Sequence, residues 1–415
     1  MTNVIAIPVP FSSDQHAMRR FVISCILAGA LLRLALSAVS AGTNDANIWM
    51  GIADHVSQVG VLEAYRTDPL MNHPPLAVLW ARLSLAVGGD TWFTFVMKLP
   101  AIAGDLLSIW LIAKIWARRG DFSKAKAAAI CMMLNPIAIL ISGYHCNTDN
   151  LYAFLCLLTM YFIDGGGRFF LAGLALAAAI NVKLIPVLLI LPAMSFCRTW
   201  RDWLKLVAGL SIGVIPFLPL VFGAYQAMHD NMLKYVPPVS PWGIAYILSD
   251  LFTHKRFEAT AYEAMKQYLW FGRWLILAGL AAISGTSILI RRWNPYELGV
   301  IVFAMFLVLA PGFGNQYLVI LVPLLLTVSV SRAWVYSILA GLFSLLMYWA
   351  YLSSVMYRGT LPTYEKPGIF SIPWLTVFPQ NGPAPGATIG LLAWWVLAAT
   401  AVWLLARKRD RQPAP

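Results

Sequence analysis

The sequence predicts an all-α, polytopic membrane protein with about twelve transmembrane helices, folded as a single domain over residues 1–415. Three observations lead to this fold class. The chain is 60% hydrophobic and only 12% charged, its mean hydropathy is +0.71, and its apolar residues form long runs separated by polar loops. Such values are typical of helical membrane proteins and exclude an ordinary soluble domain.

The excess of basic residues has a simple explanation in such a protein. The formal net charge is +12, and membrane proteins concentrate Lys and Arg in their cytoplasmic loops. We therefore expect membrane lipids, and no nucleic acid, as partners. The five cysteines are scattered, mostly inside apolar runs, which fits neither a disulfide framework nor a CxxC metal pattern.

The first apolar run, 21–39, is long enough to cross a bilayer. Because no small-residue cleavage site follows it, we expect an uncleaved first helix rather than a signal peptide. Residues 76–88 are apolar too, but this segment is short and contains Arg82. It is therefore predicted to be an interfacial helix that lies along the membrane.

Apolar runs along the rest of the chain predict the other spans. Three of them, 149–163, 169–181 and 184–197, are shorter than the ~20 residues of a full crossing, which indicates tilted, broken or re-entrant helices. The predicted spans lie near residues 20–39, 93–117, 126–142, 149–163, 169–181, 184–197, 204–223, 270–290, 296–310, 317–331, 333–352 and 388–406.

The distribution of charge predicts the orientation. With Arg19 and Arg20 in the cytoplasm, most of the 30 Lys and Arg residues fall in short inner loops, so both termini are expected on the cytoplasmic side of the cell inner membrane. The long loops then lie outside, and they contain most carboxylates and every histidine except His16. Any chemistry is therefore expected on the extracytoplasmic side. These outer loops are 40–92, 143–149, 224–269, 311–316 and 353–387.

The loop 43–76 contains the first candidate catalytic residue. It holds several carboxylates, His55, His73 and a Pro-Pro pair. Asp45 follows the outer end of the first helix directly, so a rigid span would anchor it in a partly desolvated position that suits a general base. A solvated acid at a helix end is the alternative interpretation.

Two further outer segments carry candidate binding residues. The sequence GYHCNTDN places His145, Asn147 and Asp149 on a short turn between two spans, where the alternative is a turn and N-cap role. Lys183 lies near the outer end of a helical hairpin. An ammonium at this depth either binds an anion, such as a lipid phosphate, or extends to the membrane surface.

The remaining candidates lie in the second half of the chain. The turn PGFGNQYL is broken by Gly and Pro and includes Gln316. In the loop 224–269, Lys255 and Arg256 could hold a phosphate or could face water and lipid headgroups.

Arg33 and Asp105 stand apart, because both are expected near the middle of the membrane on consecutive spans. An unpaired charge at that depth is costly. We therefore predict that the two side chains pair and hold the first two spans together, so that Asp45 is kept in place.

Together these elements resemble the GT-C superfamily of membrane glycosyltransferases. The likeness is to the endoplasmic-reticulum glucosyltransferases that use dolichyl-phosphate-glucose, and to their bacterial relatives. Asp45 in NDANIWM matches an Asp that follows the first span of that family, and 72–76 is similar to its D-Y-P-P-L-like element. Residues 143–150, with His145, look like its G-H-F-Q-Y-N-like run, and Lys183 looks like the lysine of its N-F-K element.

The resemblance covers the first half of the chain, to about residue 200, and includes two departures. Asn72 stands where the family has an acidic residue, so it cannot act as a second base. Residues 315–317 stand in the region of a His-Glu-Lys-like run that is absent here. These differences leave the donor-binding residues and the sugar open.

The resemblance implies transfer of a hexose from a polyprenyl-phosphate-linked donor to a lipid-linked or cell-envelope glycan acceptor. Asp45 would be the general base, and Lys183, with Lys255 or Arg256, would stabilise the departing lipid phosphate. The donor is a substrate, and no cofactor and no metal are required. The other residues implied in substrate binding are His73, His145, Asn147, Asp149 and Gln316.

The main alternative function is a secondary transporter or lipid flippase, and a polysaccharide polymerase or ligase is a third. Transporters usually have repeated halves with binding groups at the midplane, whereas no repeat is visible here and the polar residues gather in outer loops. A cavity at the outer leaflet lined by Asp45, His145 and Lys183 would favour the transferase. A midplane cavity between two similar halves would favour transport.

Overall fold

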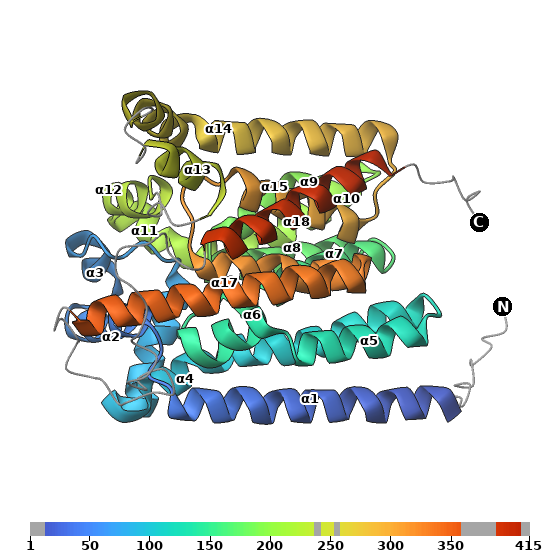
Figure 1. The fold of residues 1–415 in the computed structure, drawn as a ribbon, viewed down its shortest axis with the longest axis horizontal. Coiled ribbons are helices and arrows are strands. Elements are labelled where there is room, and N and C mark those ends of the chain that lie inside the picture. The colour runs from blue at the N-terminus through green and yellow to red at the C-terminus, as the bar shows by residue number, and fades with distance from the viewer. Residues whose placement is uncertain (1–12, 236–241, 253–257, 358–386, 408–415) are drawn as a thin grey trace.

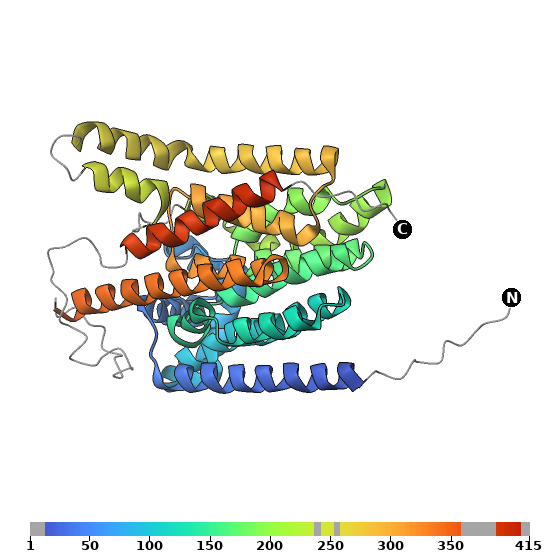
Figure 2. The ribbon, with the colours of Figure 1, turned by 45° about the vertical axis from the view of Figure 1, so that its right-hand side comes forward.

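The computed structural model describes residues 13–235, 242–252, 258–357 and 387–407, and every regular element in these ranges is a helix. The long helices run side by side along one direction (Figure 1). Helix α1 forms one flank and α14 the opposite one, with α5, α17 and α18 between them, and a view turned by 45° keeps this order (Figure 2). Helix α1 begins and α18 ends at the same end of the bundle, as the predicted orientation requires.

The elements follow the apolar runs closely but are more finely divided. In chain order they are α1 (Ser13–Val39), α2 (Asn44–Val59), α3 (Val61–Thr67), α4 (Pro75–Arg118), α5 (Phe122–Met133), α6 (Pro136–Ile139), the π-helix η1 (Leu140–His145), α7 (Asp149–Asp164), α8 (Phe169–Val182), η2 (Ile185–Leu189), α9 (Ile190–Met194), α10 (Trp200–Ile212), η3 (Ile215–Phe217), α11 (Leu218–Gly223), α12 (Tyr225–Ala227), the π-helix η4 (Met228–Leu233), α13 (Gly243–Phe252), α14 (Glu258–Ile290), α15 (Pro295–Leu309), η5 (Asn315–Leu321), α16 (Val322–Val328), α17 (Val330–Tyr357) and α18 (Ala387–Ala406).

Seven helical segments in the described ranges are long and apolar enough to cross a membrane. They are 16–39, 75–118, 122–145, 200–223, 262–290, 330–348 and 389–406. Each of the other predicted spans is also helical but shorter, such as α8 and α15. The polytopic all-α class is therefore confirmed, whereas the number of twelve crossings stays a prediction.

Helix α4 folds back on itself at Gly89, whose φ of 53° and ψ of −166° suit glycine and few other residues. Across the fold, Trp80 Nε1 donates a hydrogen bond to the carbonyl of Met97 at 3.3 Å. The arms 75–88 and 90–118 thus pack against each other. The first arm is the helix predicted at 76–88, and its position along the membrane surface stays a prediction.

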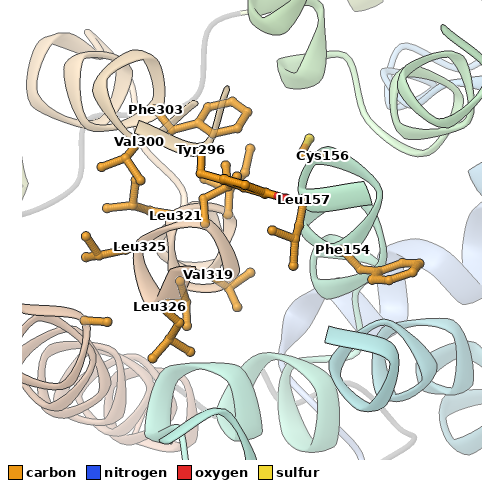
Figure 3. Packing of buried hydrophobic residues seen from close by; sticks show 14 of the residues in the cluster. Phe154, Cys156, Leu157, Tyr296, Val300, Phe303, Val319, Leu321, Leu325 and Leu326 are labelled. Carbon is orange, nitrogen blue, oxygen red and sulfur yellow. The ribbon is translucent and has the colours of Figure 1, made fainter. Parts of the chain in front are cut away.

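Two clusters of buried apolar residues hold the fold. The larger one joins most of the long helices, and Figure 3 shows part of it, where Tyr296 and Phe303 of α15 face Leu157 of α7 and Leu321 of η5. Because lipid is as apolar as these side chains, close packing rather than removal from water holds them together. The smaller cluster includes Trp49 of α2 and attaches the loop 43–74 to α4 and η4.

The predicted pairing of Arg33 and Asp105 is confirmed. Arg33 Nε donates to Asp105 Oδ2 at 2.7 Å, and both side chains are fully buried. The guanidinium also donates to the carbonyls of Met132 and Met133 at the end of α5. The pair therefore joins α1, α4 and α5 at one point, which is a wider connection than the predicted clamp of two spans.

Replacing Arg33 by methionine leaves the Asp105 carboxylate buried without its cation. We expect Arg33→Met to lower the free energy of unfolding by about 3–5 kcal/mol, as measured by denaturant unfolding in detergent micelles. The double variant Arg33→Met/Asp105→Asn removes both charges and is expected to recover part of that loss. A single variant as stable as the parent protein would contradict the structural role of the pair.

Candidate active site

Asp45 lies in the first turn of α2, where Thr43 caps the helix. Thr43 Oγ1 accepts a hydrogen bond from the Asp45 amide at 3.3 Å and donates to the carbonyl of His145 at 3.0 Å. The start of α2 is thereby tied to the turn between η1 and α7. This contact brings together two segments that are about a hundred residues apart in the sequence.

The Asp45 carboxylate is held by two side chains from that turn. Asn147 Nδ2 donates to Asp45 Oδ2 at 2.8 Å, and His145 Nε2 lies 3.2 Å from the same oxygen. Burial alone would raise the pKa of this carboxyl, but His145, Lys183 and Asn147 outweigh it and lower the pKa to about 2. With a side chain that is 30% exposed, Asp45 is thus an accessible carboxylate that stays ionised at neutral pH.

Two contacts orient the ring of His145. Its Nδ1 lies 3.0 Å from Thr43 Oγ1, and its ring stacks on Tyr348 of α17 at a centroid distance of 5.3 Å. The chain leaves η1 through Cys146, which has a φ of 67°, a conformation that costs energy for a residue other than glycine. The site therefore includes a strained turn that aims the histidine at Asp45.

Lys183 and Asp149 form a second buried group. Lys183 Nζ lies 2.9 and 3.1 Å from the two carboxylate oxygens of Asp149, and Tyr152 OH donates to the same carboxylate at 2.9 Å. The ammonium also lies 4.9 Å from the centre of the Tyr317 ring. Asp149 thus neutralises much of the lysine's charge.

A cavity of about 480 Å³ opens beside these residues. Its polar lining includes Asp45, His73, Lys183, Arg273 and Gln316, and much of the remainder is apolar, with contributions from α2, η4, α14 and α15. Several of the lining residues come from the predicted outer loops, and the cavity lies at the end of the bundle where α1 finishes. His145, Asn147 and Asp149 are not part of the cavity lining. His145 and Asn147 contact Asp45 directly, and Asp149 contacts Lys183.

His73 contributes a neutral ring to this lining. Burial, together with the charge of Lys183, lowers the pKa of His73 to about 3, although Asp45 acts in the opposite direction. The ring lies 4.3 Å from that of Trp49, measured between centroids. His73 can therefore donate or accept one hydrogen bond without carrying charge at neutral pH.

The sequence matches the protein family described as PIG-U, a GPI transamidase subunit, over residues 55–315. The chain belongs to the PIG-U family. The matched range contains His73, His145, Lys183 and Arg273, whereas Asp45 lies before it and Gln316 just after it. A search of curated proteins gives no significant match.

Two solved structures are similar to this PIG-U family member. ArnT from Cupriavidus metallidurans in the apo state has a TM-score of 0.50 and 15% identity, over 95% of this chain and 71% of ArnT. A structure of ArnT from the same organism bound to undecaprenyl phosphate has a TM-score of 0.48 and 13% identity, over 93% of this chain and 78% of ArnT. The likeness to the apo structure, with the family match, confirms the predicted GT-C fold.

Arg273 lines the cavity of this family member but was not predicted from the sequence as a site residue. Arg273, near the middle of α14, lines the cavity with Lys183 and has no ion pair among the described residues. The available signal was an arginine inside the apolar run 270–290, where a charge calls for a partner or a function. Lys255 and Arg256, which were predicted for phosphate binding, lie outside the described residues.

Replacing His145 tests the electrostatic coupling at this site. His145→Gln removes the strongest influence that lowers the Asp45 pKa, while burial continues to raise it, so we expect the pKa to rise from about 2 towards or above its ordinary value of 3.8. The protonated carboxyl can be followed by infrared titration, with Asp45→Asn as the blank. His55→Gln, at a half-buried histidine further along α2 that contacts Thr67, is the control. An unchanged titration midpoint in His145→Gln would contradict the coupling.

Proposed function

We propose that this protein is a membrane glycosyltransferase that moves a hexose from a polyprenyl-phosphate-linked donor to a lipid-linked or cell-envelope glycan acceptor. The observation that carries the proposal is a single cavity that presents the Asp45 carboxylate, Lys183 and Arg273 together. The reaction would take place at the end of the bundle that the charge distribution assigns to the extracytoplasmic side of the inner membrane. The family match, the GT-C fold and the first-half motifs support this class of protein.

Asp45 would accept the proton of the attacking acceptor hydroxyl. A carboxylate with a pKa of about 2 is a weak base towards a free alcohol. In glycosyl transfer, however, the hydroxyl oxygen bonds to a carbon with oxocarbenium character, and the hydroxyl becomes strongly acidic as that bond forms. Asp45 therefore needs to be ionised, accessible and correctly placed, which its contacts with Asn147 and His145 provide.

The leaving group would be the lipid phosphate, which carries its own negative charge and needs cations rather than a proton. Lys183, which follows α8, and Arg273 of α14 both line the cavity, and an arginine can bind two phosphate oxygens at once. Lys183 is already paired with Asp149, so Arg273 offers the less neutralised charge. His73 and Gln316 would hydrogen-bond the sugar or the phosphate.

The apolar lining suits the hydrocarbon chain of such a donor. Leu269 and Ile276 of α14 and Phe306 of α15 contribute to the same cavity as the polar groups. A ligand with an apolar chain and a phosphate headgroup would therefore find both environments in one place. This combination is less suited to a transported hydrophilic solute, for which binding groups at the membrane midplane are expected.

A second candidate function follows from the family itself, whose description is that of a GPI transamidase subunit. In such a role the cavity would hold a glycolipid for another subunit without breaking a glycosidic bond. The two functions differ in one measurable respect. Only the transferase consumes a polyprenyl-phosphate sugar when the purified protein is alone with donor and acceptor.

Asp45→Asn tests the proposed base. With a panel of polyprenyl-phosphate hexoses and membrane glycolipid acceptors, we expect the purified protein to form product and Asp45→Asn to lower kcat by about 10²–10⁴-fold, the usual contribution of a general base. Asp54→Asn changes an exposed carboxylate on the same helix and is expected to leave kcat unchanged. Activity retained in Asp45→Asn would refute the base, and binding of the donor without turnover by the unaltered protein would favour the subunit function.

Arg273→Gln tests the phosphate contact. Loss of one charged hydrogen-bonding group to the donor is expected to lower kcat/KM for the donor by about 10–100-fold. The thermal unfolding midpoint is expected to stay the same, because Arg273 forms no ion pair within the described part of the chain. Arg82→Gln, at an exposed arginine on the first arm of α4 that is not part of the cavity lining, is the matched control. Equal effects of the two substitutions would exclude a specific role for Arg273.

A further inference from the structure

A second cavity, of about 660 Å³, lies at the opposite end of the same helices. Helix α8 runs from Phe169 at this cavity to Lys183 at the first one, and α14 runs between them in the other direction, from Arg273 to Ser287. At 1.5 Å per residue, the helical path from Arg273 to the end of α14 is roughly 25 Å. The second cavity is therefore separate from the proposed glycosyltransferase site.

Three basic side chains line this cavity. Arg198 precedes α10, Lys205 lies on the second turn of α10, and Arg291 follows α14. All three are exposed, and none forms an ion pair with another described residue. Arg198 and Lys205 belong to the start of α10, whereas Arg291 follows α14, so the fold brings Arg291 to the other two charges.

The lining also contains two carboxylates, Asp164 and Asp202. Asp202 accepts hydrogen bonds from the backbone amides of Arg198 and Thr199 and completes the N-terminal cap of α10. Asp164 accepts a hydrogen bond from Tyr296 OH at 3.2 Å. These hydrogen bonds do not cancel the charges of the carboxylates, and Lys205 acts electrostatically on Asp202. The lining therefore carries three cations against two carboxylates, and this excess of positive charge attracts an anion.

The hydroxyl groups of the lining fit the same interpretation. Ser195 Oγ donates to the carbonyl of Pro192 at 2.7 Å and lies 3.2 Å from Ser287 Oγ, and Ser287 is buried at the side of the cavity. Because the Ser195 proton is directed to Pro192, Ser287 is the donor in this contact and can turn the same proton to a ligand oxygen. Arginine, lysine and hydroxyl groups together are the donors that recognise a phosphate.

Exposed apolar side chains beside the cavity indicate that the phosphate is part of a lipid. Leu204 precedes Lys205 and is 57% exposed, while Leu289 and Ile290 precede Arg291 and are 85% and 59% exposed. In a protein whose long helices are apolar enough to span a bilayer, such positions contact acyl chains. A phosphate joined to acyl chains would thus reach the cations while its chains lie along α10 and α14.

We propose that this cavity binds the phosphate headgroup of an anionic phospholipid. The site lies at the end of the bundle that the charge distribution assigns to the cytoplasm, where basic pockets between helices commonly bind anionic lipids. It has no part in the proposed transfer reaction, so a bound lipid there would support the packing of α8, α10, α14 and α15. The ligand chemistry is a phosphate ester with one or more negative charges.

Lipid retention measured on the purified full-length protein tests the proposal. The probes are phosphatidylglycerol, with phosphatidylcholine as the zwitterionic comparison, and inorganic phosphate without lipid. Native mass spectrometry is expected to show retained phosphatidylglycerol, with its affinity lowered about fivefold by Arg291→Gln and roughly 100-fold by the triple variant Arg198→Gln/Lys205→Gln/Arg291→Gln. Arg201→Gln, an exposed basic residue of α10 outside the cavity lining, is expected to have little effect.

The results separate the possible ligands. Equal losses in Arg201→Gln and Arg291→Gln, or full retention of phosphatidylglycerol by the triple variant, would overturn the proposal. Saturable binding of inorganic phosphate that needs the three cations, without preference for phosphatidylglycerol, would assign the site to a soluble phosphate compound and overturn the lipid assignment. Should the triple variant not fold, Arg291→Gln and Arg201→Gln, each with an unchanged unfolding midpoint in phosphatidylcholine, still give a decisive comparison.

Discussion

The geometry of the first cavity depends on the buried ion pair between Arg33 and Asp105. Besides Arg33, the Asp105 carboxylate accepts hydrogen bonds from Ser142 Oγ at 2.7 Å and Asn150 Nδ2 at 2.8 Å. These two residues bracket the turn that carries His145, and α1 leads directly into the loop with Asp45. A carboxylate at this depth is costly unless all its partners are in place. The requirement to satisfy Asp105 therefore favours the one arrangement in which the histidine meets Asp45.

Of the charged groups around the cavity, Asp45 and Arg273 remain available to a ligand. Asp149 and Lys183 neutralise each other, with Asp149 fully buried. Asp45 is held by His145 and Asn147 but remains 30% exposed. Arg273 enters from α14 without an ion pair in the part of the chain that the structure describes. The cavity thus presents one carboxylate and one strong cation to a ligand, and the buried pair beneath them adds a second cation only when a phosphate competes with Asp149.

The sequence was sufficient to predict the membrane depth of residues that lie within or directly beside a long apolar run. Asp45 follows the first span, and Arg33 and Asp105 lie deep in consecutive spans, so their depth could be read from the helix lengths alone. The partner of Lys183 could not be predicted, because its contact with Asp149 depends on how α7 and α8 pack. Arg273 was missed as a site residue for the same reason. The short elements around Pro186 and Pro216 divide apolar runs that look continuous, since proline removes a helical hydrogen bond.

The accessible carboxylate bears on whether the cavity only holds a lipid-linked sugar or also acts on it. A site that merely holds a phosphate lipid gains nothing from a negative charge in the same cavity, because the carboxylate repels the phosphate. The turn that supplies the partners of the ionised Asp45 includes Cys146, whose positive φ costs conformational energy. Such an arrangement is useful where a hydroxyl proton must be drawn towards the cavity. The combination of Asp45 with Arg273 therefore supports the proposed transfer to a hydroxyl acceptor more than passive binding.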